Sequence, residues 1–302
     1  MFEKLYQSIL SEKIKDRIEK VILSIAIASF IIHLLIIYLV DLKFISIDIN
    51  SNLLTNPIAA IYTPFSFILL YEVYLLIFFL PKSFTKYVSK QYEIMSLIII
   101  RRLFKDLSNL RLTGDWFNIK YDLQFSYDLA TSLLMFFLIY LFYLQSQPKK
   151  NIVDASVTSN LSLMNFIKIK KILALLLVPI FIFLAIYSFT IWINEIIFSD
   201  VNSTNSFSNI NNIFFEQFFN ILIFADVLLL LFSFYLTDDF YKVMRNSGFI
   251  ISTILIRISF STTGLVNNLL IICAILYGLF ITIIHNKFER RISTTNNDSQ
   301  EI

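Results

Sequence analysis

Residues 69–80 read LLYEVYLLIFFL, and residues 223–234 read IFADVLLLLFSF. Each run is largely apolar and holds one charged residue, Glu72 in the first run and Asp226 in the second, and the two acids are 154 positions apart. Runs of this kind are typical of helices in lipid, where an ionisable side chain is unfavourable unless it is paired or lines a wet cavity. The two runs therefore predict two membrane helices, each with one candidate functional acid.

A second pattern follows each acid along the chain. Ser96, Ile98, Ile100, Arg101 and Phe104 recur as Ser252, Ile254, Ile256, Arg257 and Phe260, displaced by 156 positions throughout. Each half of the chain thus holds one acid within an apolar run and one arginine in the segment that follows. This recurrence predicts an internal duplication.

The composition defines the class of protein. Of the 302 residues, 57% are hydrophobic and only 16% are charged, which is typical of a multi-pass membrane protein rather than a water-soluble one. Apolar runs of about 20 residues are long enough to cross the hydrocarbon layer as helices. Six segments meet this length or nearly do so: 21–40, 58–80, 124–144, 171–198, 213–236 and 266–285.

Two weaker segments, 87–104 and 243–262, hold the repeated arginine pattern, and the distribution of positive charge indicates that they also cross. With the N-terminus inside, eighteen of the 25 Lys and Arg residues then fall in cytoplasmic stretches and four in outer loops. If the weak segments stayed on one side, the lysine-rich loop 146–171 would lie outside, against this bias. We therefore predict eight transmembrane helices.

Eight helices divide into two tandem four-helix repeats, residues 1–148 and 149–302. An even number of spans in each repeat makes the two repeats parallel, with an axis along the membrane normal. The expected fold class is an all-α integral membrane protein with cytoplasmic N- and C-termini, in a bacterial inner membrane or an equivalent one. The first 20 residues are charged and amphipathic, so we expect no cleavable signal peptide.

Depth in the membrane predicts which charged side chains meet. At about 1.5 Å per residue, Glu72 and Arg101 both lie about 15 to 17 Å from the cytoplasmic edge, and Asp226 and Arg257 both lie about 18 Å from it. We therefore predict an acid–arginine pair in each repeat. Two interpretations stay open: each pair is a structural link between neighbouring helices, or the two pairs face a shared aqueous path and set its charge or its gating.

Four more residues are candidates for a role along such a path. His33 lies about 20 Å deep by the same rise, near the level of Glu72 and Arg101. A histidine ordinarily titrates between pH 5 and 8, so His33 is a candidate for pH sensing or gating, although a simple hydrogen bond to a neighbour also explains it. Asp128, Glu195 and Glu216 lie near the outer ends of their spans. They are candidate outer-mouth acids that attract cations, or ordinary interfacial residues.

The four-helix units resemble the voltage-sensor domains of cation channels, since each has an acid on its second span and an arginine on a later one. The resemblance is one of architecture. Voltage sensors carry arginines at every third residue of their fourth span, whereas Arg101 and Arg257 sit on the third span and are essentially single. The sequence also contains no TVGYG-like filter, which argues against a conventional tetrameric cation pore.

The sequence does not favour an enzyme. Asp238 and Asp239 form an acidic pair with no second acidic motif to complete a magnesium site. One cysteine, Cys273, and two histidines, His33 and His285, are too few for a zinc site or a disulfide within the chain. We expect no cofactor and no metal. The net charge of +3 comes from lysines on the inner face, so it indicates no nucleic-acid partner.

The sequence therefore favours a membrane protein that provides or gates a path for an ion or a small solute. The alternative is a membrane-embedded sensor or scaffold subunit that conducts nothing and binds a partner through its cytoplasmic loops. In either case the expected partners are membrane lipid and either further copies of this chain or another membrane protein. The residues do not name the cargo.

Overall fold

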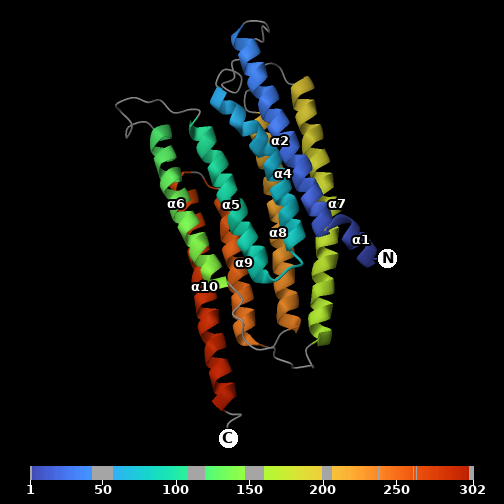
Figure 1. Cartoon of the computed structure of the whole chain (residues 1–302), viewed down its shortest axis with the longest axis vertical. Coiled ribbons are helices and arrows are strands. Elements are labelled where there is room, and N and C mark those ends of the chain that lie inside the picture. Colours follow the sequence, from blue (N-terminus) through green and yellow to red (C-terminus); the bar gives the residue numbers. More distant parts are fainter. Residues whose placement is uncertain are drawn as a thin grey trace. The chain divides into compact units, whose positions relative to one another are not determined.

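The computed structural model describes residues 2–42, 57–107, 120–146, 160–198, 206–236, 239–260, 262 and 264–298, some of them by their backbone alone. These residues form helices, and no strand occurs among them (Figure 1). In chain order the elements are α1 (Phe2–Ile9), α2 (Glu12–Asp41), the 3-10 helix η1 (Pro57–Ile61), α4 (Tyr62–Phe79), α5 (Phe84–Leu107), α6 (Lys120–Ser146), α7 (Asn160–Phe198), α8 (Ser206–Leu236), α9 (Phe240–Phe260) and α10 (Leu265–Asp298).

The protein is all-α over the described residues, and each predicted span overlaps a helix, although the span 58–80 begins in η1 before it enters α4. Among those residues, five helical stretches are long and apolar enough to cross a membrane: Glu3–Asp41, Asp122–Ser146, Met164–Tyr187, Gln217–Tyr235 and Leu265–Arg291. The apolar part of α4, Thr63–Phe79, is shorter. Helices α5 and α9 interrupt their apolar residues with charged ones, so composition alone does not mark them as spans.

Local sequence explains where several helices begin and end. The Ser11 hydroxyl accepts a hydrogen bond from the Ile14 N–H and caps the start of α2. Pro81 follows the end of α4, and the Ser83 hydroxyl accepts from the Lys86 N–H at the start of α5. Between α9 and α10, Gly264 adopts a φ of 70°, a conformation that strongly favours glycine.

The contacts divide the chain into two compact units. Unit 1 consists of Met1–Phe78, Leu97–Leu129 and Ala174–Phe219, and unit 2 consists of Phe79–Ser96, Ala130–Leu173 and Asn220–Ile302. Helices α4 to α8 contribute residues to both units. The predicted repeat boundary at 148/149 is a statement about sequence duplication and stays a prediction.

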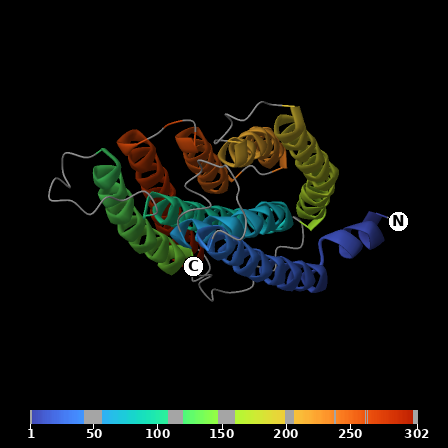
Figure 2. The ribbon, with the colours of Figure 1, turned by 90° about the horizontal axis from the view of Figure 1, so that it is seen from above.

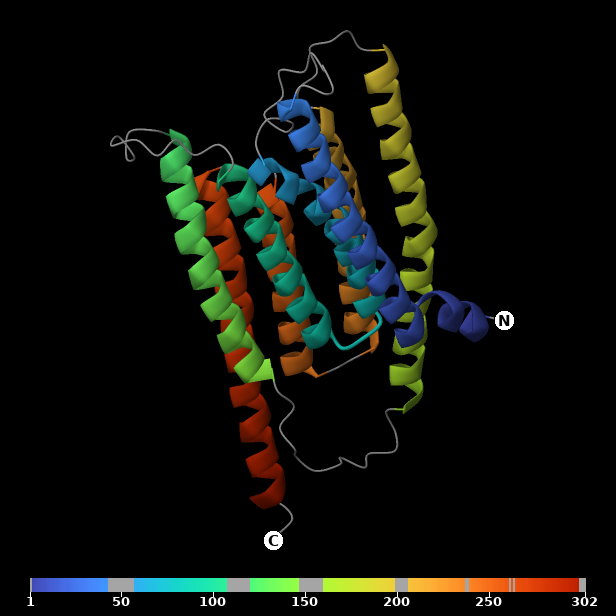
Figure 3. The same cartoon turned by 45° about the horizontal axis from the view of Figure 1, so that its top comes forward.

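Unit 1 contains α2 and η1, which lie against one another at the end of α2 (Figure 3). Aromatic side chains connect its helices: the rings of Phe65 and Phe104 stack at 5.5 Å between centroids, and those of Phe181 and Phe218 meet edge to face at 5.7 Å. Unit 1 is therefore packed through large apolar groups.

Unit 2 contains α9 and α10, which lie side by side (Figures 1 and 2). A glycine permits close approach there, since a Cβ at Gly248 would lie 2.6 Å from Cγ1 of Ile281. The centre of the unit is a buried aromatic group in which Phe142 contacts Tyr92 at 5.0 Å and Phe249 at 5.9 Å between ring centroids.

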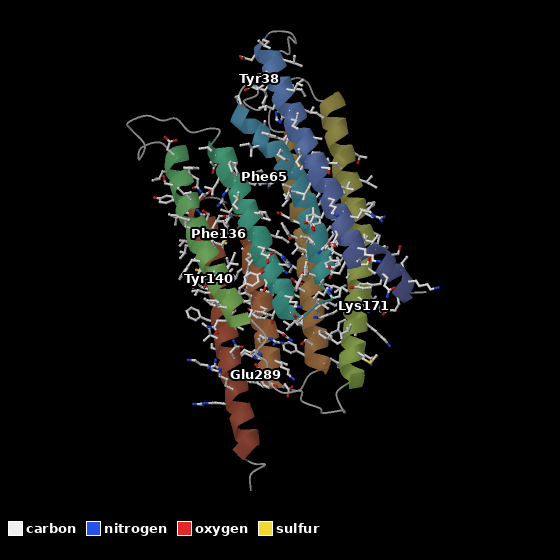
Figure 4. The ribbon with its side chains drawn as sticks, viewed as in Figure 1. Tyr38, Phe65, Phe136, Tyr140, Lys171 and Glu289 are labelled. Carbon is white, nitrogen blue, oxygen red and sulfur yellow. The ribbon has the colours of Figure 1, made fainter. Side chains whose placement is uncertain are left out.

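Each unit exposes apolar side chains and buries polar ones. Ile27, Leu133 and Phe183 are each more than 60% exposed, and Figure 4 marks two further exposed aromatic residues of α6, Phe136 and Tyr140. The buried polar and charged residues include Glu72 and Asp128 in unit 1 and Lys170, Asp226, Asn246, Ser252, Thr253 and Arg257 in unit 2. A water-soluble protein has the opposite distribution, so this one supports a lipid-facing exterior.

Candidate intramembrane charge sites

Asp226 is the centre of a buried polar group in unit 2. Its carboxylate oxygen Oδ2 lies 2.7 Å from the Arg257 nitrogen Nη2, and both side chains are almost completely buried. The Tyr87 hydroxyl donates a hydrogen bond of 2.9 Å to the other oxygen, Oδ1. The Asp226–Arg257 ion pair that depth predicted is therefore present, and both oxygens of Asp226 have a partner.

Helix geometry explains why two residues of α9 approach Asp226. Thr253 and Arg257 are four residues apart and share one face of the helix. The Thr253 hydroxyl oxygen lies 3.4 Å from Asp226 Oδ2 and 2.9 Å from the Ile250 carbonyl. Because a hydroxyl has a single proton, the shorter bond to the carbonyl takes it, and Thr253 mainly adds polarity beside the ion pair.

The repeated serine Ser252 forms a second buried polar contact in unit 2. Its hydroxyl donates to the Ala274 carbonyl at 2.6 Å, so Tyr92 is the donor in the 2.7 Å bond between the Tyr92 and Ser252 hydroxyls. Gly278 lies against the same tyrosine, since a Cβ built on it would be 1.9 Å from the hydroxyl oxygen. Helices α5, α9 and α10 thus meet at one tightly packed point.

Glu72 differs from Asp226 in its surroundings. It is 3% exposed in unit 1, and Arg101 is near enough to interact with it electrostatically. Its oxygen Oε1 is buried and has no hydrogen-bond partner among the described residues. The two acids that the sequence treats as equivalent are therefore not equivalent, because Asp226 has a partner at both oxygens and Glu72 does not.

Asp128 and Arg102 form a further ion pair in unit 1. Arg102 Nε lies 2.5 Å from Asp128 Oδ2, and Arg102 Nη2 donates to Oδ1 at 3.1 Å. Gln124, one helical turn earlier on α6, donates to Oδ1 at 2.7 Å. The Asp128 side chain is completely buried. The sequence signal for this pair is that Arg102 points about 100° away from Arg101 around the helix, toward a different neighbour.

The structure gives fewer contacts for the remaining candidates, His33, Glu195 and Glu216. His33 Nδ1 on α2 contacts the Thr63 hydroxyl at the start of α4, within unit 1. The helices that carry Glu195 and Glu216 are described, but these two side chains lie outside the described residues. A role for Asp128, Glu195 and Glu216 as outer-mouth acids stays a prediction, and so does a role for His33 in pH sensing.

Tyr87 and Tyr92 are two polar residues of these sites that the sequence did not indicate, as are Gln124 and Thr253. Both tyrosines lie on the first half of α5, in the stretch KYVSKQY, where nothing in the pattern distinguishes them from interfacial aromatic residues. Their role depends on α5 packing against α8 and α9. Within the described ranges, no three His, Cys, Asp or Glu side chains cluster in a way that could hold a metal ion.

Comparison of the chain with protein-family models, with curated proteins and with solved structures gives no match. The class of the protein accordingly rests on its own residues. Over the described residues it is all-helical, with five helices there that are long and apolar enough to span a membrane and with buried acid–arginine contacts of a kind compatible with a membrane protein.

Proposed function

We propose that this chain provides or gates a path for an ion or a small solute across a membrane. In this proposal the eight long helices α2 and α4 to α10 all cross, as two tandem parallel four-helix repeats, residues 1–148 and 149–302. The N- and C-termini are cytoplasmic, and the membrane is a bacterial inner membrane or an equivalent one. The chain carries out no enzymatic reaction and acts as a homo-oligomer or with a partner membrane protein.

One observation carries the proposal: Glu72 is a buried carboxyl group in an apolar helix, and one of its oxygens has no hydrogen-bond partner among the described residues. A buried polar atom without a partner is unfavourable by about 1–3 kcal/mol, and more for a charged group. A purely structural acid would be expected to look like Asp226, whose oxygens contact Tyr87 and Arg257. Glu72 therefore has a free acceptor oxygen that could bind an ion or a small solute as it passes through the protein.

The rival proposal is a non-conducting sensor or scaffold subunit that presents its cytoplasmic lysines to a partner. The Asp226–Arg257 and Asp128–Arg102 ion pairs favour it, since each joins two helices. Both oxygens of each acid also have a polar neighbour, Tyr87 and Arg257 at Asp226 and Arg102 at Asp128. Those two pairs suit a role as structural links. The distinction between the proposals therefore depends on Glu72.

The eight-span topology predicts which loops face outward. In a variant whose exposed cysteine Cys273 is replaced by serine, single cysteines placed at Asn109 and Ser206 are expected to react with an impermeant thiol reagent in intact cells. A cysteine at Ser156 is expected to react only after the membrane is opened. Labelling of Ser156 but not Asn109 in intact cells would show that the topology is wrong.

Flux measurements on Glu72→Gln test the proposed path. The substitution keeps the size of the side chain and removes its charge, so we expect a changed ion preference or pH response with a nearly unchanged midpoint of thermal unfolding. Asp239→Asn, which removes an exposed acid instead, should behave like the parent protein. If Glu72→Gln lowers the unfolding midpoint strongly and leaves flux unchanged, Glu72 is a structural residue. Flux through His33→Gln is measured in the same assay. If His33 is the pH-sensing residue, the dependence of flux on pH between about 5 and 8 should disappear in this variant.

A further inference from the structure

Four side chains connect α8, α9 and α10 through a continuous row of polar contacts within unit 2. The row begins at His285 of α10, whose Nε2 lies 3.1 Å from Nη1 of Arg245 on α9. Arg245 Nη2 donates to the side-chain oxygen of Asn246 at 3.2 Å, and Asn246 Nδ2 donates to the Ser233 hydroxyl of α8 at 2.8 Å. The row therefore joins three consecutive helices, of which α9 and α10 lie side by side (Figures 1 and 2).

The contact with Arg245 fixes the protonation state of His285. A guanidinium has N–H donors and no acceptor, so Nε2 of the histidine must accept this hydrogen bond. A ring nitrogen that accepts carries no proton, and the ring is then neutral with its single N–H at Nδ1. Protonation would place an N–H on Nε2, remove the bond and bring two positive groups to within 3.1 Å. The observed arrangement therefore requires a neutral His285.

The surroundings of the contact leave neither partner free to turn away. His285 is 5% exposed, and its ring stacks on that of Tyr241 with 5.5 Å between the centroids and 18° between the planes. Arg245 is held on its other side by Asn246. Since a buried group cannot exchange a lost hydrogen bond for water, protonation of His285 is relieved only if α9 and α10 separate at this end.

The charged groups that face His285 do not offset a positive ring. Among the described residues, those near enough to interact with the ring electrostatically are Arg245 and Lys242 of α9 and Glu289 of α10, which Figure 4 marks. Lys242 and Glu289 are both exposed, so water screens their charges, and Lys242 is also paired with Asp239. Arg245 therefore dominates, and its charge opposes protonation.

Two further helices approach the same end of unit 2. Lys170 of α7 is near enough to Arg245 to interact with it electrostatically, and it adds positive charge. Helix α6 contributes a neutral contact, since its Gln145 carbonyl accepts a 2.8 Å hydrogen bond from Asn286, the residue after His285. Neither helix supplies a negative charge that these contacts place beside the ring.

We propose that the Arg245–His285 contact is a pH-sensitive link, which holds α9 and α10 together while His285 is neutral and releases them when the ring takes up a proton. In the proposed topology this end of both helices is cytoplasmic, so the link responds to acidification of the cytoplasm. The proposal goes beyond the proposed function and rests on it only for the side of the membrane. Because α9 also carries Arg257, the link offers a way to control the proposed path.

The direction of the pH effect follows from which state takes up the proton more readily. The unfolded chain takes it up at the ordinary pKa of histidine, about 6.5. In the folded chain, the proton must displace the hydrogen bond from Arg245. The link therefore contributes its full stability above about pH 6.5 and loses it as the pH falls below that value.

Histidine NMR tests the protonation state directly. The chain has two histidines, so the His33→Gln protein labelled with ¹⁵N-histidine gives the ring signals of His285 alone, and the parent gives both sets. At about pH 7.5 we expect an unprotonated Nε2 and a protonated Nδ1. A protonated Nε2 at this pH would overturn the proposal.

His285→Gln is the decisive variant for stability, because glutamine keeps a neutral acceptor for Arg245 and does not titrate. Between about pH 7.5 and 5.5, the unfolding midpoint of the parent in detergent is expected to fall by about 2–4 °C more than that of His285→Gln. His33→Gln is the matched control and should fall like the parent. Equal falls in the parent and in His285→Gln contradict the link, and a fall abolished in His33→Gln assigns the effect to the wrong histidine.

Release of the helices is measured as a distance between spin labels. Cysteines at Phe240 of α9 and Phe288 of α10, both exposed, carry the labels in a Cys273→Ser background. By pulsed electron paramagnetic resonance, the distance should lengthen in the parent below about pH 6 and stay unchanged in His285→Gln. A distance that does not change with pH in the parent would show that the helices are not released.

The two proposals fail separately, since none of these measurements involves flux. If they show the pH-sensitive link but the parent passes no ion in liposomes, the link is correct and the proposed path is wrong. If the parent passes ions but His285→Gln keeps the full pH dependence of the unfolding midpoint, the path is correct and the link is wrong.

Discussion

Arg257→Gln is expected to lower the free energy of unfolding by about 3–5 kcal/mol, because it leaves the Asp226 carboxylate buried without its cation. The two side chains are 3% and 1% exposed, so water cannot replace the missing partner. Asp226→Asn should cause a similar loss, since it leaves the guanidinium unpaired. The double variant is expected to lose less than the sum of the two by about 0.5–3 kcal/mol, the range for residues in direct contact.

Thermal unfolding of the four proteins in detergent measures this coupling. The exposed ion pair of Lys242 and Asp239 provides the control, because its atoms are 2.6 Å apart while its side chains are 46% and 48% exposed. Asp239→Asn should change the free energy of unfolding by at most about 1 kcal/mol. Additive losses for the two buried substitutions would show that Asp226 and Arg257 do not stabilise one another.

Gly278→Ala is expected to destabilise the protein by about 3 kcal/mol, at the upper end of the range for overpacked cores. The added Cβ would lie 1.9 Å from the Tyr92 hydroxyl oxygen, closer than any real contact. Tyr92 is completely buried and packs edge to face on Phe142, so it cannot move aside without disturbing the centre of unit 2.

The rescue variant is Gly278→Ala combined with Tyr92→Phe. Phenylalanine removes the clashing oxygen and leaves the ring carbon Cζ 3.1 Å from the new methyl group, a tight but adjustable distance. Most of the lost stability should return. By comparison, Gly248→Ala should cost less than Gly278→Ala, because its nearest atoms belong to the half-buried Ile281 side chain. If the double variant is no more stable than Gly278→Ala alone, the steric explanation is wrong.

The sequence predicted where the long helices lie better than where they end. The first span was expected to begin at residue 21, but α2 begins at Glu12, behind the Ser11 cap. Similarly, α7 begins at Asn160 rather than 171, and α10 continues to Asp298 rather than 285. Hydropathy measures how much of a helix suits lipid, whereas backbone hydrogen bonding continues into water wherever no proline or glycine stops it.

Some contacts of the candidate sites could be predicted from the sequence and others could not. Depth along each helix was enough to pair Asp226 with Arg257, because both lie on helices consecutive in sequence. It could not find the Tyr87 contact or the Arg102–Asp128 pair, since these depend on how each helix is rotated about its own axis. Lys170 shows the same limit: the sequence places it among three lysines near a membrane surface, and only packing turns it inward.

The difference between the surroundings of Glu72 and Asp226 also comes from packing that the sequence pattern does not show. Each acid is the fourth residue of its apolar run, so the sequence pattern treats them as equal. Arg101 and Arg257 belong to the repeated pattern, but Tyr87 does not, and Tyr87 supplies a hydrogen bond to Asp226 while Glu72 Oε1 has no such donor among the described residues. A recurring sequence pattern therefore does not imply a recurring chemical environment.

The most direct measurement is flux through the purified parent protein in liposomes, with dyes for chloride, potassium and protons, under an applied potential and under a pH gradient. Flux of at least one ion above the background of protein-free liposomes is the predicted result. If the folded parent passes no ion under any of these conditions, the protein is not a path, and the non-conducting scaffold is the correct interpretation.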